Sequence, residues 1–145
     1  MLRWTRYLIY IVIDMALTPA GTALGEFEQL VLLALLRLGN GAFGAAIHRE
    51  IATRAGRDVT PAAVYVTLER LEAKRMVCSY VGTPSPLRGG RRRKHYLLDT
   101  AGQRALLRAY RTFLAMIAGL QPELDAVAAS LTPPAKTVRT VYGRW

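Results

Sequence analysis

The segment EFEQLVLLALLRL, from Glu26 to Leu38, constrains the fold more than any other part of the chain. It is apolar on nearly all sides, and a helix of that kind must be covered by other elements over most of its surface. Glu26 and Glu28 suit the positive end of a helix dipole, and Gly39 suits a helix stop. This segment is therefore predicted to be the central helix of the core.

Charge and composition narrow the class of protein. The length of 145 residues is enough for one compact domain with an appended element, and 52% hydrophobic residues are enough to form a sizeable core. The 20 Lys and Arg against 10 Asp and Glu give a net charge of +10, which indicates a polyanionic partner. With one cysteine and two distant histidines, we expect no disulfide, no metal site and no cofactor. No Ser/His/Asp or Cys/His set stands in a catalytic context, so the chain is predicted not to be an enzyme.

Two further helices are expected to cover the first. Phe43, Ile47 and Ile51 recur at four-residue spacing and predict a helix over 43–55. Thr60 followed by Pro61 indicates the start of a third helix, which runs to about residue 74. Small and adaptable residues begin its outer face, as a close approach to DNA requires. The predicted DNA contacts from this helix and its start are Thr60, Ala62, Tyr65, Val66, Thr67 and Arg70.

Two strand-like runs follow, at 76–81 and 92–98, and a long turn of Gly, Pro and Ser joins them. The run RGGRRRK at 88–94 contains five basic residues and no acid. Arginine bridges phosphate oxygens or enters a narrow minor groove, where the potential is most negative. A basic hairpin tip, or wing, beside a recognition helix predicts a reader of two DNA grooves. The predicted wing contacts are Arg88, Arg91, Arg92, Arg93 and Lys94.

The last helix, expected from Ala101 onward, carries apolar residues at alternating steps of four and three. Such a sustained seam indicates a dimerisation stripe. The residues of this stripe are Leu106, Tyr110, Phe113, Ile117 and Leu120. Pro122 lies within the continuing pattern and predicts either a kink or a break of the helix.

Four segments of this chain are similar to the PadR family of bacterial winged-helix transcriptional regulators. They are LVLLALL at 30–36, GAFG at 41–44, AVYVTLERLEAK at 63–74 and GGRRRKHYLLDTAG at 89–102. The resemblance covers about residues 25–120, and MarR-type regulators share a similar wing. It implies a homodimer, operator binding by the third helix and the wing, dimerisation through the C-terminal helix and, usually, repression. Some family members bind aromatic or drug-like ligands, but no residue here marks an effector pocket.

The predicted fold is therefore mainly α with a small β-hairpin wing, a winged helix-turn-helix followed by a C-terminal dimerisation helix. Its predicted parts are an N-terminal extension at 1–24, the DNA-binding domain at 25–100, the dimerisation helix at 101–131 and a flexible basic tail at 132–145. The apolar run in the extension is too short to span a bilayer. We favour translation from Met15, with a signal peptide or an extra strand as alternatives. The protein is expected in the cytoplasm, associated with the nucleoid.

The predicted function is that of a homodimeric repressor that binds an inverted repeat in double-stranded DNA. The alternative is a small basic adaptor that binds an anionic membrane surface or a protein partner, without sequence-specific binding to DNA. Membrane binding predicts a basic amphipathic helix, whereas the basic residues here cluster on a hairpin. RNA binding is a third possibility, but the aromatic residues that would stack on bases from a sheet face are missing from the sequence. The pattern GNGAFG at 39–44 matches a dinucleotide-binding fingerprint, yet the run before it is helical, so a turn between helices is the better interpretation.

Two single residues have more than one interpretation. Cys78 is either a redox-sensitive thiol near arginines or, more commonly for a lone cysteine on a strand, a small buried hydrophobe. His95 either contacts phosphate or covers a strand surface.

Overall fold

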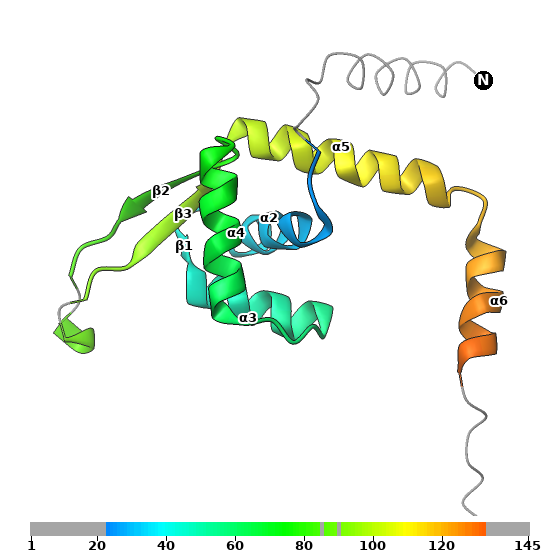
Figure 1. The fold of residues 1–145 in the computed structure, drawn as a ribbon, viewed down its shortest axis with the longest axis horizontal. Coiled ribbons are helices and arrows are strands. Elements are labelled where there is room, and N and C mark those ends of the chain that lie inside the picture. The colour runs from blue at the N-terminus through cyan, green and yellow to red at the C-terminus, as the bar shows by residue number, and fades with distance from the viewer. Residues whose placement is uncertain (1–22, 85, 90, 133–145) are drawn as a thin grey trace, which may run out of the picture. The chain divides into compact units, whose positions relative to one another are not determined.

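The computed structural model describes residues 23–132 apart from 85 and 90. The extension predicted at 1–24 lies outside these residues up to residue 22, and the tail predicted at 132–145 lies outside them from residue 133. Figure 1 shows a small sheet with helices beside it, and a hairpin that projects away from these helices. The elements are α2 (Glu26–Leu38), β1 (Ala42–Phe43), α3 (Gly44–Ala55), α4 (Pro61–Ala73), β2 (Val77–Val81), the 3-10 helix η1 (Pro86–Arg88), β3 (Lys94–Leu98), α5 (Thr100–Ile117) and α6 (Gln121–Leu131). The expected class, mainly helical with a small wing, is confirmed.

Helix α2 forms the centre of the core, as predicted. Its Leu32 and Leu35 are fully buried, and α3 and α4 pack against it. The other buried apolar residues include Ile47 and Ile51 of α3 and Val64, Leu68 and Leu71 of α4. One side of α2 is not covered within the described chain, because Leu33 and Leu36 are exposed.

A third strand, β1, was not expected from the sequence. Its two residues are extended and pair antiparallel with β3, Ala42 opposite Tyr96 and Phe43 opposite His95. Helix α3 consequently begins at Gly44, one residue later than predicted. The sheet has the order β1-β3-β2, so the hairpin strand β3 lies between the strand before α3 and the strand after α4.

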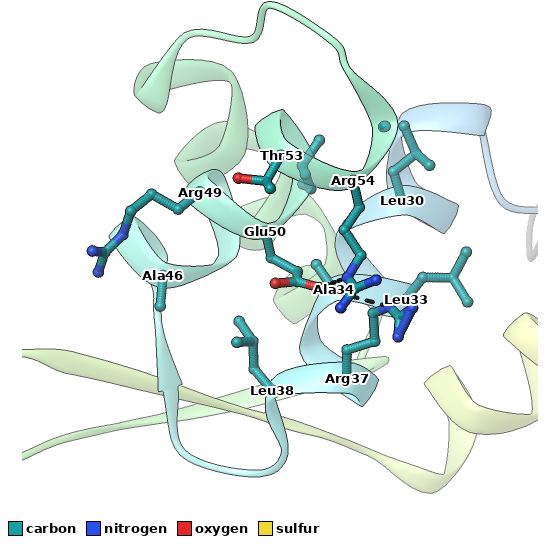
Figure 2. A pocket seen from close by; sticks show the side chains of 12 residues that line it. Leu30, Leu33, Ala34, Arg37, Leu38, Ala46, Arg49, Glu50, Thr53 and Arg54 are labelled. Atoms are coloured by element: carbon teal, nitrogen blue, oxygen red, sulfur yellow. Dashed lines mark hydrogen bonds and ion pairs between the residues drawn. The ribbon is translucent and has the colours of Figure 1, made fainter.

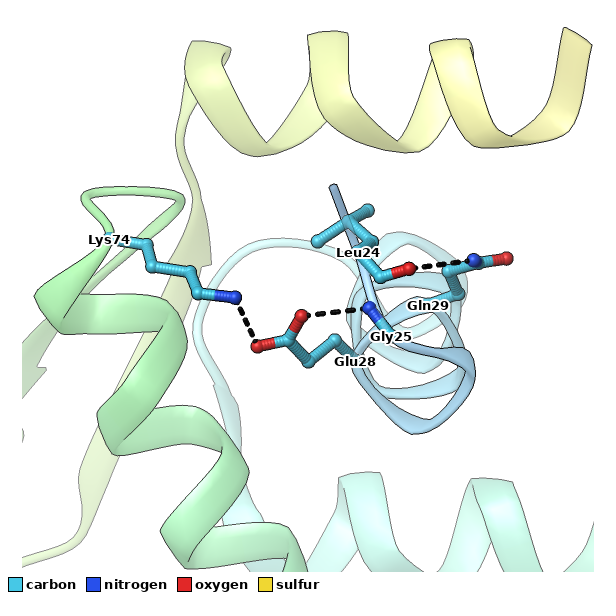
Figure 3. A network of polar contacts seen from close by, with 5 residues as sticks. All are labelled: Leu24, Gly25, Glu28, Gln29 and Lys74. Carbon is cyan, nitrogen blue, oxygen red and sulfur yellow. Dashed lines mark hydrogen bonds and ion pairs between the residues drawn. The ribbon is translucent and has the colours of Figure 1, made fainter. Parts of the chain in front are cut away.

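The two ends of α4 are held by polar contacts. At its start the Thr60 hydroxyl accepts a hydrogen bond from the Ala63 amide at 3.3 Å, the cap that the sequence predicted. Just after its end, Lys74 forms an ion pair of 2.7 Å with Glu28, which also accepts a hydrogen bond from the Gly25 amide (Figure 3). Burial raises the pKa of Glu28, but these hydrogen bonds outweigh it and the pKa lies below its ordinary value. Helix α4 is thereby tied to α2.

The open question at Pro122 is answered by a break. Helix α5 ends at Ile117, Gly119 takes a left-handed conformation with φ of 80°, and α6 starts at Gln121 with Pro122 in its first turn. A proline is tolerated there because the first amides of a helix have no intrahelical partner. The chain divides into two units at Thr112 within α5. All residues of α6 are exposed in the described chain.

Gly102 lies in the first turn of α5 against the backbone of Met76, just before β2, and replacing it tests this packing. A Cβ at Gly102 would collide with the backbone carbonyl oxygen of Met76. Ala is normally favoured over Gly in a helix by about 1 kcal/mol. We expect the opposite sign here, because a backbone atom must move: G102A should lower the free energy of unfolding by about 1–3 kcal/mol. Urea unfolding measures the difference, with the exposed neighbour Gln103→Ala as the control. A G102A variant as stable as wild type would contradict this packing.

Candidate DNA-binding surface

The outer face of α4 presents the side chains expected of a recognition helix. Ala62, Tyr65, Val66 and Arg70 are all exposed. The Tyr65 ring lies against Gly44, where a Cβ would collide with it. The glycine at the start of α3 therefore allows Tyr65 to lie across the helix-turn-helix, a role that sequence reasoning did not assign.

Thr67 is the exception among the predicted contacts from α4. Its side chain is only 6% exposed, and its hydroxyl donates a hydrogen bond of 2.8 Å to the Ala63 carbonyl. It lies on the same side of the helix as Val64 and Leu68, which form part of the core. The structure therefore places Thr67 in the core rather than on the exposed face of α4.

The wing is a ladder of five residue pairs between β2 and β3, with a long loop at its tip. A hydrogen bond of 2.8 Å from the Gly82 amide to the Arg93 carbonyl closes the base of the loop. Arg91 and Arg92 are exposed in the loop, ahead of the strand in which the sequence placed Arg92. The backbone of Arg88 lies in η1, and its side chain is outside the described part of the structure.

Two of the predicted wing contacts are engaged within the protein. The Arg93 guanidinium lies 3.8 Å from the centre of the Phe43 ring, a cation–π contact. Lys94 forms an ion pair of 2.9 Å with Glu72 of α4. Hydrogen bonds from the Ser79 hydroxyl and from Lys94 hold the pKa of Glu72 below its ordinary value, and the bond to Glu72 raises the pKa of Lys94. Arg93 and Lys94 therefore join the wing to β1 and α4, while Arg91 and Arg92 extend beyond this framework.

His95 belongs to the same framework. Its Nδ1 lies 2.5 Å from the Gly41 carbonyl oxygen, and its ring stacks on Tyr80 at 5.1 Å and meets Phe43 edge-on. Of the two interpretations of His95, the structure supports the covering of a strand surface. Cys78, by contrast, is exposed on β2, so the expectation that it is buried is wrong.

The apolar stripe of α5 divides into two parts. Leu106 is only 6% exposed and packs in the core of the single chain rather than on its surface. Tyr110, Phe113 and Leu120 are exposed, Phe113 to 65%, and Ile117 is half-buried. The stripe is thus a core contact at its start and an uncovered apolar surface beyond it.

A second uncovered surface is a groove of about 940 Å³ between α2 and α3 (Figure 2). Leu30, Leu33 and Leu38 are among its apolar lining residues. At its rim, Glu50 pairs with Arg54 at 2.6 Å and with Arg37 at 3.6 Å. The residues that line this groove belong to neither α4 nor the wing.

Within the described part of the chain, no group of three or more His, Cys, Asp or Glu is arranged to hold a metal ion. In the same residues, no helix combines the length and the apolar character that crossing a bilayer requires.

An exposed helix beside a basic antiparallel hairpin, both built on a three-helix core, defines a winged helix-turn-helix protein of the DNA-binding class. The model of the "Transcriptional regulator PadR-like family" matches residues 32–108, more than half of the chain. The chain therefore belongs to this family, whose members are DNA-binding transcription factors and not enzymes. The resemblance found in the sequence is confirmed. No curated protein matches the chain.

Solved structures of related proteins share the fold. A PadR family transcription regulator from hypervirulent Clostridium difficile R20291 is 23% identical with a TM-score of 0.58, covering 69% of this chain and 99% of its own. A PadR family regulator from Eggerthella lenta DSM 2243 is 20% identical with a TM-score of 0.54, covering 86% and 98%. The protein F93 from STIV, described as a winged-helix DNA-binding protein, is 15% identical with a TM-score of 0.51, covering 63% and 90%.

The contacts of Glu72 lead to a prediction on acid stability. The pKa of Glu72 is lowered in the folded state, so the ionised carboxylate stabilises the fold. This stabilisation is fully present at pH values above the ordinary pKa of 4.5 and is lost as the pH falls through the lowered pKa. E72Q should therefore be less stable than wild type at neutral pH, and the difference should shrink toward acid. The measurement is the free energy of unfolding between about pH 7 and pH 3. Glu69→Gln, on the exposed face of α4, is the matched control. Parallel curves for wild type and E72Q would contradict the prediction.

Proposed function

We propose that this protein is a homodimeric transcriptional repressor that binds an inverted repeat in double-stranded DNA. The observation that carries the proposal is the exposed face of α4 beside a wing loop, residues 83–92, that has three arginines and no acid. Helix α4 would enter the major groove through Tyr65, Val66 and Arg70. Thr60 and Ala62, at the helix start, would approach the phosphate backbone, which the positive end of the helix dipole favours.

In the wing, the proposal assigns the DNA contacts to Arg88, Arg91 and Arg92. Arg93 and Lys94 instead stabilise the position of the loop, since Arg93 packs on the Phe43 ring and Lys94 forms an ion pair with Glu72. A side chain that must first leave an intramolecular partner contributes less to binding than a free one. The wing therefore meets the backbone or the minor groove with its tip and is braced at its base.

Self-association rests on the apolar surfaces that the described single chain leaves open. Tyr110, Phe113 and Leu120 are exposed on or just after α5, and Leu33 and Leu36 are exposed on α2. Surfaces of this kind mark protein–protein contacts when they are contiguous. A two-fold dimer would place its two recognition helices on half-sites about 10 bp apart, or a multiple of that spacing. The proposed location is the cytoplasm, on chromosomal DNA.

Fluorescence anisotropy of the full chain tests the proposal, with a duplex from its own upstream region and a scrambled duplex as probes. Both titrations are repeated at about 50 and 200 mM salt, between which phosphate-driven binding falls by orders of magnitude. We expect tighter binding to the upstream duplex, and lower transcription from it in a purified system when the protein is added. Binding only to anionic vesicles, and to neither duplex, would support the membrane-adaptor alternative.

Arg92→Ala tests the wing. Loss of a phosphate contact should weaken binding to both duplexes and reduce the slope of log K against log salt by about one for each protomer. Arg104→Ala removes the same charge from α5, outside α4 and the wing, and is the matched control. Equal slopes for R92A and R104A would show that Arg92 does not touch DNA.

Phe113→Asp tests the dimer. An aspartate in place of an aromatic side chain would put a charge into the apolar contact, so we expect a monomer by sedimentation where wild type is a dimer. Because Phe113 is exposed in the single chain, the variant should keep its fold, which circular dichroism checks. The nearby exposed Thr112→Asp is the control for charge alone. A dimer that persists in F113D would exclude Phe113 from the interface.

A further inference from the structure

Leu87 stands out among the exposed apolar side chains. It is 96% exposed, more than any other large hydrophobic residue of the described chain. It lies at the middle of η1, in the loop beyond the last hydrogen bond of the hairpin. Leu87 therefore contributes nothing to the core, and its position is at the tip of the element proposed to reach DNA.

The local backbone gives this tip a defined shape. Pro86 opens η1 and restricts its own φ, so the turn loses little conformational freedom on ordering. Gly89 follows in a left-handed conformation with φ of 63°, which ends the turn at a residue without a Cβ. Leu87 is thus carried on a short turn between a proline and a glycine rather than on an unstructured stretch.

The chemistry of the loop sets an apolar side chain among cations. Arg88, Arg91 and Arg92 follow Leu87 within five residues, and no acid occurs in residues 83–92. Arginines attract the loop to phosphates or into a narrow minor groove. Leucine gains nothing from phosphate, but leucine is one of the side chains that proteins insert between base steps in the minor groove.

We propose that Leu87 acts as an apolar wedge, which enters the minor groove next to the arginines that follow it, partly unstacks one base step and bends the duplex. The inference rests on the proposed function, since it requires that the wing reaches DNA. It adds a source of specificity that needs no hydrogen bond to a base. Pyrimidine–purine steps such as TA and CA unstack most easily, so the wedge would favour sites that carry such a step beneath the wing.

The test measures bending and binding separately. A duplex of about 30 bp from the upstream region carries a donor and an acceptor dye at its two ends, and energy transfer reports the bend. A second copy of the duplex carries 2-aminopurine at a TA or CA step, and its emission rises when that base unstacks. Wild-type protein should increase both signals on binding. Leu87→Ala should lose both signals at saturating protein and bind about tenfold more weakly.

Two variants control the interpretation. Val81→Ala removes an exposed apolar side chain from the end of β2, outside the loop, and should leave bend and affinity unchanged. Leu87→Met replaces leucine with another large apolar side chain that can act as a wedge, and this variant should retain the bend. The wedge is overturned if wild type binds without bending the duplex, or if L87A bends it as wild type does, whatever its affinity. In both cases the DNA-binding function stands, whereas failure of wild type to bind any duplex removes the proposed function together with the wedge.

Discussion

The pairing of β1 with β3 is the contact on which the geometry of the candidate site depends. Two residues before α3, Ala42 and Phe43, pair with the strand that leads out of the wing. Through this pairing Phe43 meets both His95 and Arg93, and the Gly41 carbonyl meets His95. The hairpin is thereby fixed to the start of α3, and with it to the helix-turn-helix.

This framework divides the basic residues of the wing by the work they do. Arg93 and Lys94 lie next to the ladder, where Phe43 and Glu72 are within reach. Arg91 and Arg92 lie further along the loop and are exposed. The basic run therefore has two parts: Arg93 and Lys94 make contacts within the protein, whereas Arg91 and Arg92 are accessible to a partner. The division arises from distance to the sheet, since the residue types are the same.

Much of the helical framework could be predicted because its signals are local. The cap at Thr60, the apolar run of α2 and the four-residue spacing in α3 depend on neighbours within one or two turns. Thr67 was within reach of the same reasoning, since it lies three residues after the buried Val64. The strand β1 and the partner of Lys94 were not, because two extended residues carry no period and Glu72 is brought to Lys94 only by the fold.

Helix α5 shows why periodicity alone does not separate a core from an interface. Leu106 and Tyr110 occupy successive positions of one apolar stripe, yet Leu106 is buried in the winged-helix core and Tyr110 is exposed. The spacing reports only that one side of a helix avoids water, and it does not say which surface covers that side. Further along the same helix, Tyr110 and Phe113 are exposed. Apolar residues that extend along a helix beyond the part packed on the core are the physical reason to expect that a second copy of the chain covers them.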